Sequence, residues 1–219
     1  MFIDRKHAGR ELSKKLLYLK DENPLVLAIP RGGVPVGYEI AKALQADFSL
    51  IIARKLPFPY NPESGFGAIS EDGSGVILNQ AKSIFSAETI ETIIEEQKLE
   101  IKRRIQVLRG GHPLPEITDR TVILVDDGIA MGSTMLAAIK LIKKREPKSL
   151  IVTAPVSSPE VGRALDKNNA VDDSVILERP QFFRAVAQVY ENWRDIPDHE
   201  VLDIMNQWKI EKTNKQYHE

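Results

Sequence analysis

Apolar residues follow two alternating patterns along this chain: short, nearly continuous runs and longer stretches with a helical period. The runs are apolar on both faces, as the buried strands of parallel sheets are, and they occupy residues 25–29, 48–53, 121–125, 150–154 and 174–177. Between the runs, apolar side chains recur three and four positions apart, which predicts amphipathic helices over residues 4–23, 36–44, 90–109, 135–144 and 160–167. Because strands and helices alternate, the pattern predicts an α/β fold with a doubly wound, mostly parallel sheet.

One stretch after the second run interrupts this alternation. Residues 55–66 include three prolines, and proline fixes φ and removes a backbone donor. We therefore expect a long, exposed and flexible loop there. Next to it, two short apolar segments flank the Glu-Asp-Gly-Ser turn at 71–74, which predicts a β-hairpin over residues 67–78.

The chain changes character beyond Pro180. It is first rich in aromatic residues, then polar and helical from about Asp198. With 219 residues, the chain has room for one domain with an appendage. We expect an α/β core over residues 1–180, and a C-terminal segment over residues 181–219 that belongs to the same domain.

Composition and charge act mainly by exclusion. The chain has 30 Lys and Arg against 31 Asp and Glu, and this balance argues against a protein that coats nucleic acid. It has no cysteine, which excludes disulfides, iron–sulfur clusters, cysteine zinc sites and thiol nucleophiles. No apolar signal segment follows the first residues, and no apolar run approaches the roughly 18 residues of a membrane helix. We therefore expect a cytoplasmic protein that does not enter a membrane.

The candidate chemistry is concentrated in residues 122–134. A buried strand delivers Asp126 and Asp127 to its carboxyl end, where open α/β sheets bind ligands. A loop of small residues then enters a helix, whose backbone N–H groups form an anion site. Carboxylates beside a phosphate cradle predict a sugar phosphate as ligand. An isolated Asp-Asp-Gly would more simply end a strand and cap a turn, but the flanking strand and helix favour the ligand site.

This segment resembles the phosphoribosyl-pyrophosphate (PRPP) signature of the type I phosphoribosyltransferases. By that resemblance, Asp126 and Asp127 hold the ribose hydroxyls. The residues that would wrap the 5-phosphate are Ala130, Met131, Gly132, Ser133 and Thr134. The likeness covers roughly residues 2–202 and extends to bacterial phosphoribosyltransferase-like proteins of unsettled substrate.

Arg31, Gly32 and Gly33 follow the first strand and form a second candidate segment. Glycines allow the backbone to approach an anion, and an arginine can donate two hydrogen bonds to phosphate oxygens. Most Gly-Gly pairs form ordinary turns. This pair is a candidate anion-binding loop because it lies one strand before the motif of residues 122–134. The segment is similar to the family's pyrophosphate loop, which often contains an unusual cis peptide.

The resemblance to the family also suggests roles for two further pairs of residues. Arg54 and Lys55, expected at the end of the second strand, resemble basic residues at the base of a mobile loop that closes over the reacting centre; two solvated charges are the alternative. In the family a variable hood covers the acceptor base, so residues 181–219 would form a hood and a helical tail. Phe182 and Phe183 are candidates for stacking on the base, with ordinary core packing equally open.

The resemblance implies an enzyme that moves the 5-phosphoribosyl group of PRPP to a small nitrogenous base and releases pyrophosphate. It also implies a homodimer and Mg²⁺. We expect no metal site formed by the protein alone, because the histidines do not cluster; Mg²⁺ would be held by PRPP, with Asp126 and Asp127 as candidate ligands.

Two positions depart from the family pattern. Met131 stands where a threonine is common, so one phosphate-binding hydroxyl is lost. Ala130 stands where enzymes of 6-oxopurines usually carry an aspartate, which disfavours hypoxanthine and guanine as acceptors. The alternative function is a non-catalytic regulator that senses PRPP and binds nucleic acid or a protein partner. The basic residues that it would use are Lys140, Lys143, Lys144, Arg145 and Lys148.

Overall fold

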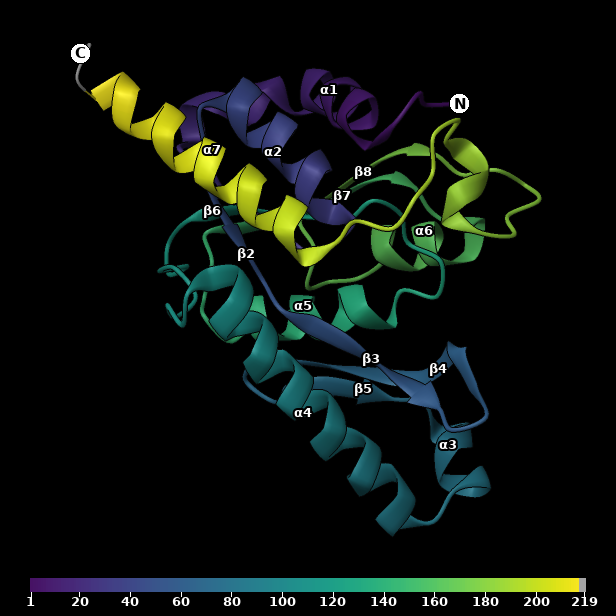
Figure 1. The fold of residues 1–219 in the computed structure, drawn as a ribbon. Coiled ribbons are helices and arrows are strands. Elements are labelled where there is room, and N and C mark those ends of the chain that lie inside the picture. The colour runs from purple at the N-terminus through teal and green to yellow at the C-terminus, as the bar shows by residue number, and fades with distance from the viewer. Residues whose placement is uncertain (217–219) are drawn as a thin grey trace.

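The centre of the protein is a five-stranded parallel sheet, seen in a computed structural model that describes residues 1–216 (Figure 1). Its strand order is β2-β1-β6-β7-β8. The strands are β1 (Leu25–Ala28), β2 (Asp47–Leu50), β6 (Thr121–Val125), β7 (Ser149–Val156) and β8 (Asp173–Glu178). This confirms the predicted α/β fold with a mostly parallel sheet. Because β2 and β6 lie on opposite sides of β1, the winding changes direction between β1 and β6.

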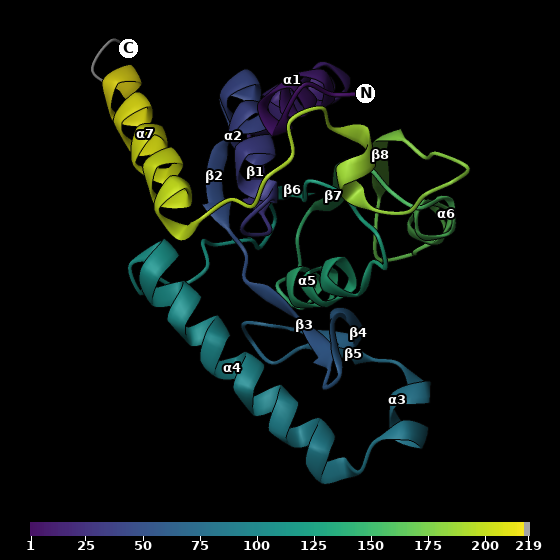
Figure 2. The same cartoon turned by 45° about the vertical axis from the view of Figure 1, so that its right-hand side comes forward.

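Helices cover both faces of this sheet (Figures 1 and 2). The bounds are α1 (Arg5–Leu16), η1 (Leu17–Glu22), α2 (Gly33–Leu44), α5 (Ser133–Lys143) and α6 (Pro159–Asp166). Side chains of β1 alternate between two apolar clusters: Val26 packs with α1 and α2, whereas Leu27 packs with α5. The double burial explains why the sequence of this strand is apolar on both faces.

A second, antiparallel sheet follows β2 and corrects one expectation. Its strands are β3 (Ala53–Phe58), β4 (Asn61–Ser70) and β5 (Gly75–Ile77), in the order β3-β4-β5. The expected irregular, exposed loop over residues 55–66 is therefore wrong, because most of it is a hairpin in which Leu56 and Phe66 are fully buried. Pro57 is accommodated because β3 is an edge strand with a register shift at this position. The β4–β5 pairing confirms the hairpin expected over residues 67–78.

Helices α3 (Asn79–Ile84) and α4 (Ala87–Arg109) complete this region. The Ser86 side chain caps α4, and Gly110, with φ of 63°, ends it. Figure 2 shows α4 as a long helix that runs from the central sheet past the β3–β5 sheet. This places one helix in reach of both sheets.

The C-terminal part consists of η2 (Val186–Val189) and α7 (Asp198–Gln216), which begins where the sequence predicted a helix. Helix α7 lies beside α2 (Figure 1). The Trp208 ring meets Phe48 and Tyr38 edge-on, at centroid distances of 5.8 and 6.3 Å. Across the described residues, none of the helices has the length and apolar character needed to cross a bilayer.

Candidate functional site

The carboxyl ends of β1 and β6 meet at the point where the sheet changes winding direction. The Ile29 N–H donates to the carbonyl of Val125 at 2.9 Å, so the loop after β1 starts beside the end of β6. A Cβ on Gly32 would lie 1.9 Å from Asp127 Oδ2, and one on Gly33 would lie 2.9 Å from the Val125 carbonyl oxygen. The structure thus brings the two candidate loops into contact, and only glycine fits there. The Pro30–Arg31 peptide is cis.

A cavity of about 200 Å³ lies on the β6 side of this contact. It is lined by Lys55, by Asp126 and by residues of the loop and helix start over 128–135. Gly132 adopts a φ of 76° and precedes α5 without any side-chain cap. The first N–H groups of α5 therefore have no side-chain acceptor, and an anion in the cavity would satisfy them.

The two adjacent carboxylates have different environments. Burial, and then the negative charge of Asp127, raise the pKa of Asp126 well above its ordinary value. Asp126 Oδ1 accepts the N–H of Asp127 at 2.8 Å. Asp127 Oδ2 instead accepts a hydrogen bond from Arg5 Nε at 2.7 Å, in an ion pair whose side chains are 13% and 7% exposed, respectively. Asp126 thus faces the cavity while Asp127 is held by a cation.

Arg5 is a residue of this site that the sequence did not reveal. Its Nη1 donates to the carbonyl of Arg194 at 2.8 Å, and its guanidinium lies 3.9 Å from the centre of the Trp193 ring. The hydroxyl of Tyr190 donates to the Asp127 carbonyl at 2.7 Å. The first helix and the C-terminal segment therefore close over Asp127. At the start of a helix Arg5 reads as an ordinary exposed residue, so the sequence held no signal for it.

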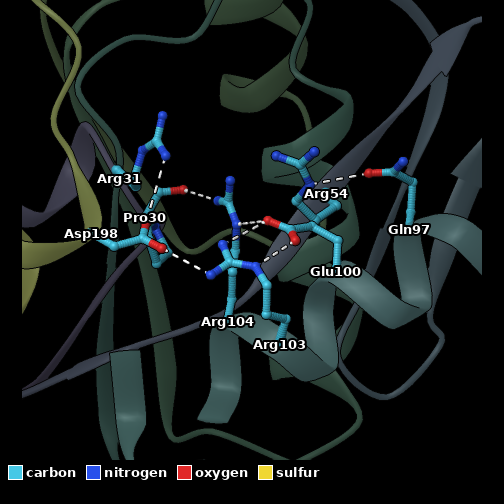
Figure 3. Close-up of polar contacts among 8 residues, drawn as sticks. All are labelled: Pro30, Arg31, Arg54, Gln97, Glu100, Arg103, Arg104 and Asp198. Carbon is cyan, nitrogen blue, oxygen red and sulfur yellow. Dashed lines mark hydrogen bonds and ion pairs between the residues drawn. The ribbon is translucent and has the colours of Figure 1, made fainter. Parts of the chain in front are cut away.

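The side chains of Arg54 and Lys55 point to opposite faces of strand β3, because successive residues of a strand alternate between its two faces. Both lie within β3, not at the end of the second strand as predicted. Lys55 lines the cavity, whereas Arg54 Nε donates to Gln97 Oε1 of α4 at 3.1 Å (Figure 3). Burial, followed by the positive charge of Arg104, lowers the pKa of Arg54. Arg31 lies near Arg54, outside the cavity, and its Nη1 is 3.5 Å from Asp198 Oδ1 (Figure 3).

The two aromatic candidates are placed apart from the cavity. Phe182 is 83% exposed. Phe183 packs against a small cluster that includes Phe2, Val156 and Tyr190. Neither ring is among the residues that line the cavity. Phe183 thus shows the core packing that the sequence left open, and stacking on a base stays a prediction for both rings.

The family model described as phosphoribosyl transferase domain matches residues 4–191. The chain belongs to the phosphoribosyl transferase family. This confirms the type I resemblance that the motif over residues 122–134 carried.

Relatives in this family cover nearly the whole chain. Proteins from two strains of Mycobacterium tuberculosis, named provisionally as phosphoribosyl transferases, are 34% identical over 208 residues, which is 94% of this chain and 46% of theirs. This chain therefore spans about half the length of these curated relatives. The crystal structure of TT1426 from Thermus thermophilus is 35% identical, covers 95% of this chain and 99% of its own, and superposes with a TM-score of 0.78.

Proposed function

We propose that this protein transfers the 5-phosphoribosyl group of PRPP to a small nitrogenous base and releases pyrophosphate. The observation that carries the proposal is the cavity in which Lys55 and Asp126 face the uncapped start of α5. An anion site beside a carboxylate suits the 5-phosphate and the hydroxyls of a ribose. The adjoining loop with Arg31 suits the pyrophosphate group.

In this reaction the bond between the anomeric carbon and the pyrophosphate oxygen breaks, and the oxygen keeps the electron pair. A ring nitrogen of the base forms the new bond and gives up its proton, if it carries one, to solvent or pyrophosphate. The chain contributes position and charge, with no protein nucleophile. Asp126 and Asp127 orient the ribose, Arg31, Arg54 and Lys55 stabilise the leaving group, and Ser133 and Thr134 hold the 5-phosphate.

Mg²⁺ belongs to the proposal as a companion of PRPP. Among the side chains that the structure describes, which leave out residues 62–63 and 215–219, no group of three His, Cys, Asp or Glu is placed to bind a metal ion. Asp127 is paired with Arg5, so Asp126 is the carboxylate best placed to share an ion with the substrate. This donor set fits an ion held mainly by phosphates and water. An Mg²⁺ ion bound there would neutralise charge on the pyrophosphate group.

The acceptor and the assembly state are the finer parts of the proposal. Ala130 at the start of the phosphate loop disfavours 6-oxopurines, and a homodimer is expected from the family. The regulator alternative receives no support from its basic residues. Lys140 donates to the Gly75 carbonyl at 3.0 Å, and Lys144 pairs with Asp72 at 3.2 Å, so they hold the second sheet against α5.

Calorimetry with PRPP and Mg²⁺, followed by a screen of bases for pyrophosphate release, tests the proposal. We expect saturable PRPP binding and release with at least one base that is not a 6-oxopurine. Asp126→Asn is the matched inactive variant, because it keeps the shape and removes the carboxylate. Absence of PRPP binding would refute the proposal, whereas PRPP-dependent binding of RNA without any release would favour the regulator.

A further inference from the structure

Arg104 of α4 lies outside every motif that the sequence singled out, yet it contacts the loop after β1. The residue is 7% exposed. Its Nη1 donates to the carbonyl of Pro30 at 3.4 Å, and its Nε donates to Glu100 Oε1 at 2.9 Å. Helix α4 thereby contacts the segment that presents Arg31.

Three guanidinium groups from separate segments gather at this contact. They belong to Arg31 of the loop, Arg54 of β3 and Arg104 of α4, which we call the arginine cluster (Figure 3). The pKa of Arg54 is lowered by burial first, and then by the charges of neighbouring arginines that include Arg104 and Arg31. Arg54 is therefore close enough to Arg104 and Arg31 for their positive charges to act on it.

The contacts that anchor the cluster leave hydrogen-bond donors available. Arg54 uses Nε on Gln97, and Arg104 uses Nε and Nη1. Among the described side chains, the terminal nitrogens of Arg54 and Nη2 of Arg104 form no hydrogen bond. None of these three nitrogens is fully enclosed by protein. These N–H groups can therefore serve a ligand that enters the site.

The charges around the cluster do not balance. The three arginines and the nearby Arg103 face two carboxylates, those of Glu100 and Asp198. Grouping like charges costs free energy, and a bound anion relieves that cost. A guanidinium presents its donors as a planar fork that matches phosphate oxygens.

We propose that Arg104 completes an anion site for a diphosphate group, together with Arg31 and Arg54. Arg104 holds the Pro30 carbonyl in place and adds a third positive charge to the site. The inference rests on the proposed function, in which the diphosphate is the pyrophosphate group of PRPP. Because Gly32 and Gly33 contact Asp127 and the end of β6, a diphosphate held there lies next to the ribose-binding carboxylates.

Calorimetry of the full chain with two probes tests this role. One probe is inorganic pyrophosphate with Mg²⁺, and the other is ribose 5-phosphate, which lacks the diphosphate. Arg104→Gln is expected to weaken pyrophosphate binding about tenfold, the loss of one charged hydrogen bond, and to leave ribose 5-phosphate affinity within about twofold. Unchanged pyrophosphate affinity, or an equal loss for both probes, would overturn the proposal.

Arg103→Gln is the matched control on the same helix. Arg103 also contacts Glu100, with its Nε 2.7 Å from Oε2, but its side chain is 45% exposed. We expect its pyrophosphate affinity to stay within about threefold of the original. A loss as large as that of Arg104→Gln would attribute the effect to the packing of α4 and would count against the proposal.

Glu100→Gln covers the case in which Arg104→Gln does not fold. The amide keeps an acceptor for Arg104 and removes one negative charge, so pyrophosphate should bind about threefold more tightly or better. Unchanged or weaker binding would contradict an anion site here. The two proposals fail separately: base-dependent release that survives intact in Arg104→Gln refutes only this inference. Cluster-dependent pyrophosphate binding without any transfer refutes only the enzymatic function.

Discussion

Asp126 and Asp127 are neighbours in sequence, but each interacts with a different part of the molecule. Asp126 faces the cavity and has a raised pKa because it is buried beside a second carboxylate. Asp127 is held by Arg5, which in turn stacks on Trp193. The sequence alone suggested two equivalent ribose ligands. In the structure, Asp126 faces the cavity, whereas Asp127 is held in its orientation by the cation of Arg5. The difference arises from residues distant in sequence.

Removing Arg5 tests this arrangement. Arg5→Met should lower the free energy of unfolding by about 3 to 5 kcal/mol, because Asp127 is left as a buried charge without its partner. Urea denaturation at neutral pH measures the change. Arg10→Met serves as the control, because Arg10 lies on the same helix and its side chain is 53% exposed, with Nη1 3.5 Å from Glu39 Oε1. Since exposed ion pairs contribute little, this variant should change the free energy of unfolding by less than about 1 kcal/mol. Similar losses in both variants would contradict the role of Arg5.

At the scale of elements, helix α4 contacts both sheets through a buried face that carries apolar and polar side chains. Its buried positions are Ile93, Gln97, Ile101, Arg104 and Leu108. The spacing of three and four keeps them on one helix face, which packs toward β3 and β4. Two polar residues within this apolar stripe are the one sequence signal that could have revealed the arginine cluster, because polar side chains on a buried face require specific partners.

The hydrogen bonds of Glu100 with Arg103 and Arg104 make a contribution to stability that depends on pH. Hydrogen bonds from Arg103 and then Arg104 lower its pKa from 4.5 to about 2. A carboxylate with a lowered folded pKa stabilises the protein above about pH 4.5, and this contribution disappears as the pH falls toward 2. After allowance for solvent screening, we expect Glu100→Gln to cost about 1 kcal/mol at pH 7 and almost nothing near pH 2.

Urea titrations of the original protein and the variant at both pH values measure this difference. Glu95→Gln is the control, because the Glu95 side chain is 60% exposed and, among the described side chains, its carboxylate bonds only Lys98 of the same helix. A Glu100→Gln deficit that persists undiminished at low pH would show that the contact is not electrostatic.

The β3–β4 hairpin is stabilised by an aromatic cluster. Phe66 is fully buried, and its ring lies 5.7 Å from Phe58 and 5.8 Å from Phe85. Phe66→Ala should reduce the free energy of unfolding by about 3 to 5 kcal/mol, through lost burial and the cavity that remains. Tyr60→Ala at the tip, where the side chain is 96% exposed, should be nearly neutral in thermal melting. Equal melting temperatures for both variants would refute a packed hairpin.

At the scale of the whole molecule, the C-terminal segment contacts the core at two separate places. Residues 189–194 cross over Arg5 and Asp127, and α7 packs its Trp208 against β2 and α2. Both contacts lie within residues 181–216, the described part of the segment expected over 181–219; that this segment belongs to the same domain as the core stays a prediction, and residues 217–219 lie outside the described residues. They also connect the tail to the carboxylates and, through Asp198, to Arg31.

Cooperative unfolding tests that expectation. The chain has two tryptophans, so Trp193→Phe leaves Trp208 on α7 as the single tryptophan, whose fluorescence can be excited selectively. We expect its fluorescence and the far-ultraviolet circular dichroism to change at the same urea concentration, because one domain unfolds in one transition. An earlier fluorescence transition would show that α7 unfolds independently. Trp208→Phe, which keeps Trp193 as reporter beside Arg5, is the matched comparison.

The errors of prediction have physical causes at particular residues. Prolines in residues 55–66 predicted a loop, but an edge strand tolerates Pro57 because its N–H is not needed by a neighbour. Arg5 bonds a residue 122 positions away, and Arg104 bonds one 74 positions away. The contact of Arg5 leaves no local pattern, and that of Arg104 leaves only a polar residue within the apolar stripe of α4. The positions of Asp126, of the loop before α5 and of the loop after β1 were predictable because strand, loop and helix follow one another directly in the chain.

The sequence by itself determined the succession of strands and helices and the chemical character of each loop, because side-chain periodicity and turn residues act over a few positions. Only the tertiary structure decided which charges meet. The reversal of strand order between β1 and β6 brings the loop of Arg31 against the two aspartates. The packing of α4 beside β3 then brings Arg104 to the same loop. Such partners are set by the geometry of the sheets, which depends on contacts across the whole chain.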